Sequence, residues 1–257
     1  MNMQSVVAKK KFGQNFLKDQ SVLRKIVEAM PKNENKIVEI GPGLGDLTKF
    51  LVDVRSVEAF EVDTDLCKLL QSTFKEEIDT KRLHINCGDV LQVWKSTLVD
   101  EEYDLVANLP YYIATNIILK ALADPMCKNI LVMVQLEVAE KFCATAGEKV
   151  FGSLSIIAQS VGTATIVTKV PPTAFDPQPK VDSAVFLIQK NSDRSDKEFE
   201  DMLRVAFTQP RKTLMKNLSQ KYDKPTLIEA FEKLNLIHTI RPHQVDTKDY
   251  HQLYKII

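Results

Sequence analysis

The stretch EIGPGLGDLT, residues 39–48, decides the fold. It ends the apolar run KIVEIG (36–41) with Gly41, Gly43 and Gly45 and then opens a helical pattern. Glycines after a buried strand let the backbone turn tightly and let a ligand approach the amides of the helix start. The turn differs from the dinucleotide fingerprint GxGxxG, because position 46 is Asp46 and the third glycine comes one place early. A glycine-rich turn alone is a weak signal, so its meaning depends on the strands around it.

Short strand-like runs alternate with helical segments from residue 36 to about 136. The strand candidates are KIVEIG (36–41), SVEAFEV (56–62), RLHINC (82–87), YDLVAN (103–108) and NILVMVQ (129–135). Between them, apolar residues recur three and four apart, as in helices that face a sheet. This alternation predicts an α/β fold with a doubly wound, mostly parallel sheet. Two more β-rich runs, TATIVTKV (163–170) and SAVFLIQK (183–190), are candidates to complete the sheet as an antiparallel pair.

The chain changes character after residue 190. The segment KNSDRSDKEFE (190–200) is polar, as a linker is, and the pattern beyond it is purely helical. Phe199, Met202 and Leu203 share one helical face, which ends before Pro210. We therefore expect two domains, an α/β domain at 1–190 and a small all-helical domain at 191–257.

Composition is that of a soluble globular protein, with 257 residues, 44% hydrophobic and 26% charged. The longest apolar run, ILVMV (130–134), is too short to span a bilayer, and no secretion signal is evident. The cysteines form no CxxC pair and no metal set with histidine: they are Cys67, Cys87, Cys127 and Cys143. We expect reduced, mostly buried thiols of a cytoplasmic protein that holds no metal.

Charge is unevenly distributed although the net charge is zero. Residues 1–32 carry seven basic and two acidic residues, and residues 33–190 carry 15 basic and 22 acidic ones. Residues 204–224 hold six basic residues and one acidic residue. Such runs are either solvated faces or a surface for a polyanion, and charge alone leaves both open.

Two acidic residues follow the next strands in chain order. Glu61 ends the second strand, where an acid can accept the hydroxyls of a bound ribose. Asp89, after the third strand, is placed to accept from an adenine amine. Each carboxylate alone is better explained as a helix cap or a surface charge. Together with the glycine turn, however, they resemble the class I S-adenosylmethionine-dependent methyltransferases, which have a Rossmann-like fold.

The fourth strand ends in NLPYYIAT (108–115), a sequence suited to holding an adenine amine. That amine is a poor nucleophile because its lone pair is delocalised, and oxygens that accept its hydrogens favour the pyramidal nitrogen of the transition state. We expect the Asn108 side-chain carbonyl and the Leu109 backbone carbonyl to accept, with Pro110 holding Leu109 extended. Tyr111 is then placed to stack on the base, a contact worth roughly 1–3 kcal/mol. The alternative is that Tyr111 only fills a hydrophobic space under the edge of the sheet.

A base taken out of its stack needs a ring on each face. Phe175, in the proline-stiffened loop PPTAFDPQPKVDS (171–183), is the candidate for the second ring. The alternative is a core phenylalanine that anchors the loop.

Nearly the whole chain resembles the bacterial KsgA/RsmA family of small-subunit ribosomal RNA adenine dimethyltransferases. The matching motifs are KKKFGQNFLKD (9–19), EIGPGLGDLT (39–48), NLPYYIAT (108–115), FDPQPKVDSAV (175–185), RKTLMKNL (211–218) and IRPHQVDTKDYHQLY (240–254). The resemblance implies dimethylation of two adjacent adenosines near the 3′ end of small-subunit RNA during ribosome biogenesis. The methyl donor is S-adenosylmethionine, with S-adenosylhomocysteine as the product. The implied partner is the immature small subunit, and we expect a monomer.

The resemblance also assigns roles position by position. The catalytic set is Asn108, Leu109, Tyr111 and Phe175; the donor-binding set is Asn15, Leu17, Gly41, Glu61, Asp89 and Asn108; the RNA-binding set is Lys9, Lys10, Lys11, Arg211, Lys212 and Lys216. The chain departs from the family pattern at Pro210, where a basic residue is expected, and at Phe151, where a tyrosine is expected.

Other functions fit parts of the pattern. One is the related large-subunit RNA methyltransferase family that confers antibiotic resistance, whose strand-four motif more typically has Ile at the position of Leu109. Another, of a different class, is a non-catalytic assembly factor on the same fold. A small-molecule methyltransferase would need neither the basic N-terminal arm (residues 1–32) nor the helical tail (residues 191–257). The residues alone do not distinguish one methyl from two, or identify the adenosines.

Overall fold

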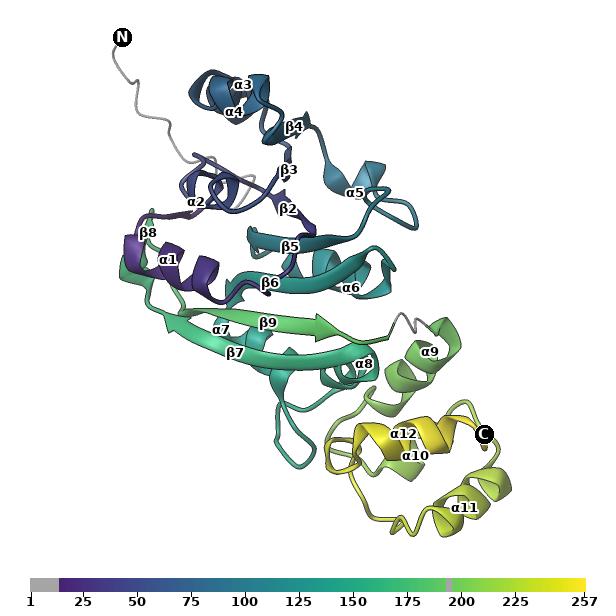
Figure 1. Cartoon of the computed structure of the whole chain (residues 1–257). Coiled ribbons are helices and arrows are strands. Elements are labelled where there is room, and N and C mark those ends of the chain that lie inside the picture. Colours follow the sequence, from purple (N-terminus) through teal and green to yellow (C-terminus); the bar gives the residue numbers. More distant parts are fainter. Residues whose placement is uncertain (1–13, 193–195) are drawn as a thin grey trace. The chain divides into compact units, whose positions relative to one another are not determined.

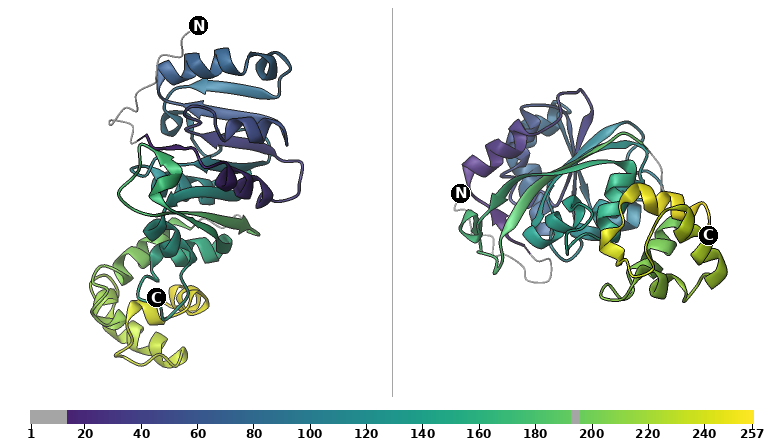
Figure 2. Two further views of the ribbon diagram at one scale, coloured as in Figure 1. Left: turned by 90° about the vertical axis from the view of Figure 1, so that its left-hand side faces the viewer. Right: turned by 90° about the horizontal axis from the view of Figure 1, so that it is seen from below.

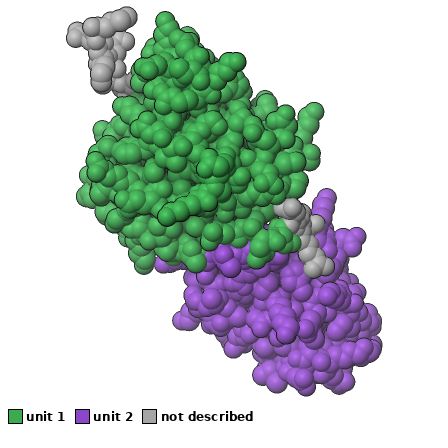
Figure 3. All heavy atoms as spheres, in the orientation of Figure 1, with its two compact units in different colours: residues 1–139, 165–193 green, residues 140–164, 194–257 purple. Residues whose placement is uncertain are grey.

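A computed structural model describes residues 14–192 and 196–257 of the chain. It divides into two compact units, residues 1–139 with 165–193 and residues 140–164 with 194–257 (Figure 3). The second unit takes 140–164 in addition to the predicted tail. The reason is packing, since Phe151 and Ile156 belong to the same hydrophobic cluster as Phe199 and Leu203. A boundary at residue 190 alone therefore does not describe this division.

A seven-stranded sheet forms the centre of the first unit, in the order β4-β3-β2-β5-β6-β9-β7 (Figure 1). The strands are β2 (Lys36–Ile40), β3 (Val57–Glu61), β4 (Leu83–Cys87), β5 (Tyr103–Asn108), β6 (Cys127–Gln135), β7 (Gly162–Val170) and β9 (Ser183–Lys190). The five strands from β4 to β6 pair in parallel, and β9 pairs antiparallel to β6. The predicted doubly wound, mostly parallel sheet is confirmed.

Helices cover both faces of this sheet (Figures 1 and 2). They are α1 (Gln20–Glu28), α2 (Thr48–Val52), α3 (Thr64–Thr73), α4 (Lys75–Asp79), α5 (Val90–Val93) and α6 (Ala114–Ala123), followed by α7 (Leu136–Cys143). Aspartates begin three of them: the side chains of Asp19, Asp63 and Asp89 accept from backbone amides of α1, α3 and α5. Such caps satisfy amides that the helix itself leaves without partners. The caps therefore fix where the helices start beside the strand ends.

A second, two-stranded sheet lies outside the predicted pattern. It pairs β1 (Phe16–Leu17) antiparallel with β8 (Phe175–Asp176), which follows the short 3-10 helix η2 (Pro172–Ala174). Leu17 is opposite Phe175, and both side chains are buried in the main hydrophobic cluster. Strands of two residues carry no periodicity, so sequence patterning could not find them.

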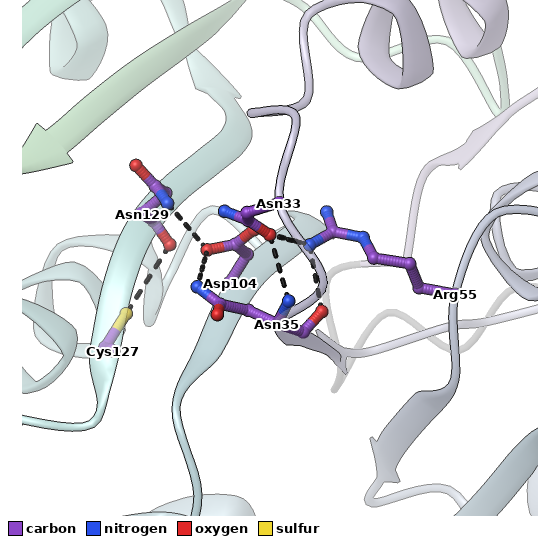
Figure 4. Close-up of polar contacts among 6 residues, drawn as sticks. All are labelled: Asn33, Asn35, Arg55, Asp104, Cys127 and Asn129. Atoms are coloured by element: carbon purple, nitrogen blue, oxygen red, sulfur yellow. Dashed lines mark hydrogen bonds and ion pairs between the residues drawn. The ribbon is translucent and has the colours of Figure 1, made fainter.

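A buried polar cluster crosses the sheet where β2 and β5 begin (Figure 4). Asp104 accepts from the side-chain amides of Asn129, at 2.7 Å, and Asn35, at 3.3 Å, and pairs with Arg55 at 2.9 Å. Arg55 also donates to the side chain of Asn33 and to the backbone oxygen of Asn35. Through these hydrogen bonds and the ion pair, the cluster ties the loop before β2 to two strands.

The second unit is helical and has its own core. It contains α8 (Ser153–Val161), α9 (Lys197–Ala206), α10 (Leu214–Leu218), α11 (Lys224–Lys233), the 3-10 helix η3 (Pro242–Gln244) and α12 (Thr247–Tyr254). Phe199, Met202 and Leu203 face this core, as predicted. Phe151 is also buried in it, so a tyrosine hydroxyl at that position would need a buried partner. No helix in the described part of the chain is long and apolar enough to cross a membrane.

The expectation of four reduced cysteines is wrong for two of them in this structure. Cys67 on α3 and Cys87 at the end of β4 form a disulfide, with their Cα atoms 6.0 Å apart. They are 20 residues apart in the sequence, and only the packing of α3 against β4 brings them together. Cys127 and Cys143 are free thiols.

Candidate active site

A cavity opens at the carboxyl ends of β2, β3, β4 and β5, the edge where open α/β sheets bind ligands. All of the predicted donor-binding residues line it: Asn15, Leu17, Gly41, Glu61, Asp89 and Asn108. Leu109 and Tyr111 line it as well. Residues from four strand ends and from β1 therefore meet around one space, although the sequence separates them by almost a hundred positions.

The glycine turn forms the floor of this cavity in a conformation that favours glycine. Gly41, Gly43 and Gly45 have φ values of 72°, 62° and 83°. At Gly45 a Cβ atom would lie 2.5 Å from the Phe74 ring, and at Gly43 it would lie 3.1 Å from Phe16. Both the backbone conformation and the close packing require glycine here.

Glu61 is buried at the end of β3, with its carboxylate held by two backbone amides. One carboxylate oxygen accepts from the Asp63 amide at 2.8 Å, and the other accepts from the Gly43 amide at 3.2 Å. Burial raises the pKa of Glu61, and the two amide donors oppose this rise. The carboxylate is thus fixed beside the glycine turn, where an acceptor for ribose hydroxyls is needed.

Glu39 is a second buried acid in the cavity wall, and sequence reasoning missed it. It is 1% exposed and accepts a 2.7 Å hydrogen bond from the Thr48 hydroxyl at the start of α2. Burial raises the pKa of Glu39 to about 8. The carboxyl therefore carries its proton at neutral pH. A signal was present, because this acid comes two residues before Gly41 in a strand that is otherwise apolar.

Asp89 lines the cavity and also begins α5, because its carboxylate accepts from the Leu91 amide at 3.0 Å. The helix-cap role and the proposed ligand role are therefore compatible, since a carboxylate has acceptor positions for both.

Asn108, at the end of β5, is oriented by a bond to the N-terminal part of the described chain. Its side-chain nitrogen donates to the Asn15 backbone oxygen at 3.2 Å. Because the side-chain nitrogen is engaged there, the group that the Asn108 amide can offer to a ligand is its carbonyl oxygen, which is an acceptor. The Leu109 amide donates to the Met133 backbone oxygen at 3.1 Å, which fixes the exit from the strand. Pro110 follows and lies against Gly41.

Tyr111 lines the cavity half-buried, with its hydroxyl 2.7 Å from the Ser183 hydroxyl. Ser183 is fully buried at the start of β9. Burial raises the pKa of Tyr111, so the phenol stays protonated and can share this hydrogen bond. The ring is held by a residue that sequence reasoning did not select.

Phe175 is not among the residues that line the cavity. It is 4% exposed and packs into the core opposite Leu17, where an apolar ring is most stable. The structure brings Tyr111 to the cavity without this second ring. A role for Phe175 in holding a base stays a prediction, and it requires the ring to leave the core.

The predicted RNA-binding residues fall in two parts. Lys9, Lys10 and Lys11 lie outside the described residues. Arg211, Lys212 and Lys216 are exposed in the second unit, before and on α10. Their exposure makes these side chains accessible to a phosphate backbone.

Comparison with known proteins agrees with this geometry. The family model described as ribosomal RNA adenine dimethylase matches residues 6–257. Over 254 residues the chain is 80% identical to ribosomal RNA small subunit methyltransferase A of Sulfurimonas denitrificans, covering 99% of this chain and 95% of that protein. Its identity to the protein of the same name from Aliarcobacter butzleri is 50%, with 98% and 97% covered.

Two solved structures share the fold. A dimethyladenosine transferase from Plasmodium falciparum has a TM-score of 0.79 at 26% identity, covering 92% of this chain and 95% of that one. The 23S rRNA methyltransferase ErmE has a TM-score of 0.74 at 23% identity, covering 94% and 98%. The likeness to ErmE shows the fold alone.

Proposed function

The chain belongs to the ribosomal RNA adenine dimethylase family, and from this premise we propose how its residues carry out the reaction. It is an S-adenosylmethionine-dependent rRNA adenine dimethyltransferase. It acts on two adjacent adenosines near the 3′ end of small-subunit ribosomal RNA, during ribosome biogenesis. The roles of individual residues are the proposal.

The chemistry of the cavity suits the donor. S-adenosylmethionine supplies an electrophilic methyl group on a positively charged sulfur. In the proposal Glu61 accepts from its ribose, Asp89 accepts from its adenine amine, and Gly41 allows close approach. Asn15 and Leu17 border the methionine part. The fixed carboxylate of Glu61 supports this assignment, because its two amide bonds set its position before a ligand arrives.

The end of β5 then holds the target amine. Asn108 and Leu109 offer carbonyl oxygens to the amine hydrogens, which favours the pyramidal nitrogen that attacks the methyl carbon. Tyr111 stacks on the flipped base, and Phe175 is the proposed second ring. The amine nitrogen forms the new bond as the bond from sulfur to methyl breaks, and the amine proton passes to solvent. After one methyl is added, one amine hydrogen remains for the second transfer.

RNA contacts outside the pocket are proposed for the basic residues. Lys9, Lys10 and Lys11 and, in the second unit, Arg211, Lys212 and Lys216 would contact phosphates, a contribution that weakens with salt. We also propose that the protein works as a monomer and in the cytoplasm, where immature small subunits are found.

One observation carries the proposal most strongly: Asn108, Leu109 and Tyr111 line the same cavity as Glu61 and Asp89. The test incubates immature small subunits that lack the modification with the protein and labelled S-adenosylmethionine. Mass spectrometry should find dimethyladenosine at two adjacent positions. Asn108→Ala should reduce the rate by 100-fold or more, about the loss seen when a transition-state acceptor or donor is removed.

A second outcome would favour an assembly factor instead. If the wild type bound the particles in a salt-sensitive way without methylating them, and Asn108→Ala bound equally well, the catalytic roles assigned to the β5 end would be wrong. Methylation of large-subunit RNA alone would instead contradict the choice of substrate.

A further inference from the structure

Residues 14–19, which we call the lid segment, run along the wall of the donor cavity. Asn15, Phe16 and Leu17 line the cavity. The Asn15 backbone oxygen accepts from Asn108, and the Gln14 side chain donates to Asp63 at 3.2 Å. This segment therefore contacts both the ribose-side and the amine-side ends of the site.

An ion pair joins the lid segment to the glycine turn. Lys18 Nζ lies 2.6 Å from a carboxylate oxygen of Asp46. Asp46 is the residue that stands where GxGxxG would have its third glycine, and the donor roles above leave it without a function. Its carboxylate follows the turn directly, so the pair fastens the lid to the backbone that shapes the cavity floor. Nearby, a Cβ atom at Gly43 would lie 3.1 Å from Phe16, so the lid also packs closely on the turn.

The lid segment is hydrogen-bonded to the loop that carries Phe175, although the two are far apart in the sequence. β1 pairs with β8, and the backbone amides of Lys18 and Asp19 both donate to the Ala174 oxygen, at 2.8 and 3.3 Å. A shift of the lid therefore breaks bonds that hold the loop, and a shift of the loop loosens the lid.

We propose that Lys18 and Asp46 form a latch that positions the lid segment over the methyl donor and, through the pairing of β1 with β8, also positions the loop around Phe175. The inference rests on the donor site proposed above. The two residues are positioning residues, because they act through the lid and through the turn.

The Lys18–Asp46 ion pair should affect donor binding and the local dynamics of the lid segment more than the overall stability of the fold. Its side chains are 41% and 25% exposed, and exposed ion pairs contribute little to the stability of a fold. Apart from the buried Leu17, the lid segment is held by single hydrogen bonds and by a two-residue strand pairing. Segments held in this way open more readily than the core. The same weak pair can therefore decide how often the lid is closed.

The experiment reverses the two charges. Lys18→Asp and Asp46→Lys each place like charges together, and the double variant restores an opposite pair. Binding of S-adenosylhomocysteine and of S-adenosylmethionine is measured by calorimetry without RNA. Each single variant should weaken binding roughly threefold to fivefold, the upper range for an exposed pair, and the double variant should recover to within about twofold of the wild type. Lys49→Asp is the control, because Lys49 is exposed on α2 outside the cavity lining.

A second readout needs no donor. In hydrogen exchange of the free protein, both single variants should speed exchange at residues 16–19 and at 174–176 together, and the double variant should slow both again. In steady-state assays the singles should raise KM for the donor more than they lower kcat. The latch would be overturned if the single variants bound the donor as tightly as Lys49→Asp does. It would also be overturned if hydrogen exchange became faster at residues 16–19 and not at 174–176. A chain that bound donor normally but failed to methylate RNA would contradict the proposed function and leave the latch standing.

Discussion

Glu39 and Glu61 are buried acids at the ends of neighbouring strands, but their surroundings differ. Glu61 accepts two backbone amides, which favour the charged carboxylate. Glu39 accepts a single hydroxyl, and burial raises its pKa to about 8. The cavity therefore combines a carboxylate that is ready to accept hydrogen bonds with a neutral carboxyl that can also donate one. Position along a strand would not distinguish these two roles.

The protonation of Glu39 predicts a pH-dependent stability. In the unfolded chain this carboxyl titrates near 4.5, and in the folded chain near 8. Between these values the folded state keeps a proton that the unfolded state releases, so the free energy of unfolding falls as pH rises, by up to about 1.4 kcal/mol per pH unit from this group. Glu39→Gln removes the titration and keeps an acceptor for Thr48. Urea unfolding at pH 5 to 8 should show the free energy of unfolding of the variant rising relative to that of the wild type as pH rises. A difference between the two that stays constant with pH would contradict a protonated Glu39 in the folded state.

At the residue scale, motifs at strand ends located residues that line one cavity, and the donor-binding role of those residues stays a prediction. Every predicted donor-binding residue taken from motifs lines the cavity. Sequence reasoning missed residues whose role depends on a partner far away in the chain, such as Ser183 beside Tyr111 and Asp46 beside Lys18. It placed Phe175 beside the base because of its loop, whereas the structure buries the ring opposite Leu17. A local sequence pattern does not distinguish a ring that stacks on a base from a ring that is buried in the hydrophobic core.

At the element scale, periodicity located the strands of the sheet well, because the central strands β2, β5 and β6 are buried apolar runs. It could not locate β1 and β8, which exist only because each has the other as a partner. Nor did it assign α8 to the second unit, since that choice depends on packing against α9. Pairing and docking between elements are the properties that a linear pattern omits.

The cluster around Asp104 holds three elements, and its loss should be costly. Asp104→Ala leaves Arg55, whose side chain is 7% exposed, without its buried partner. Removing one member of a buried ion pair costs about 3–5 kcal/mol, and the amides of Asn35 and Asn129 lose an acceptor as well. Denaturant unfolding should report this loss. Asp201→Ala, which breaks the exposed pair with Arg204, is the control and should cost no more than about 1 kcal/mol. Equal effects of the two variants would contradict a structural role for the cluster.

For the whole molecule, the uneven charge predicts how RNA is held. The acidic middle of the sequence should repel phosphate, so we expect RNA binding to depend on the basic residues of the second unit and of the segment 1–32. Replacing Arg211, Lys212 and Lys216 by alanine removes three proposed phosphate contacts, each worth about 0.7 to 0.9 in the slope of log K against log salt.

With a small-subunit RNA fragment, the magnitude of this negative slope should therefore decrease by about 2 to 3. The loss of affinity relative to the wild type should be largest at low salt. Because phosphate contacts carry no sequence information, related and unrelated RNAs should lose affinity in parallel. Donor binding in the first unit should not change. The matched control replaces three exposed lysines of the first unit, Lys68, Lys75 and Lys95, by alanine. If both triple variants lowered the slope equally, net charge rather than a binding surface in the second unit would explain RNA affinity, and the helical tail would need another role.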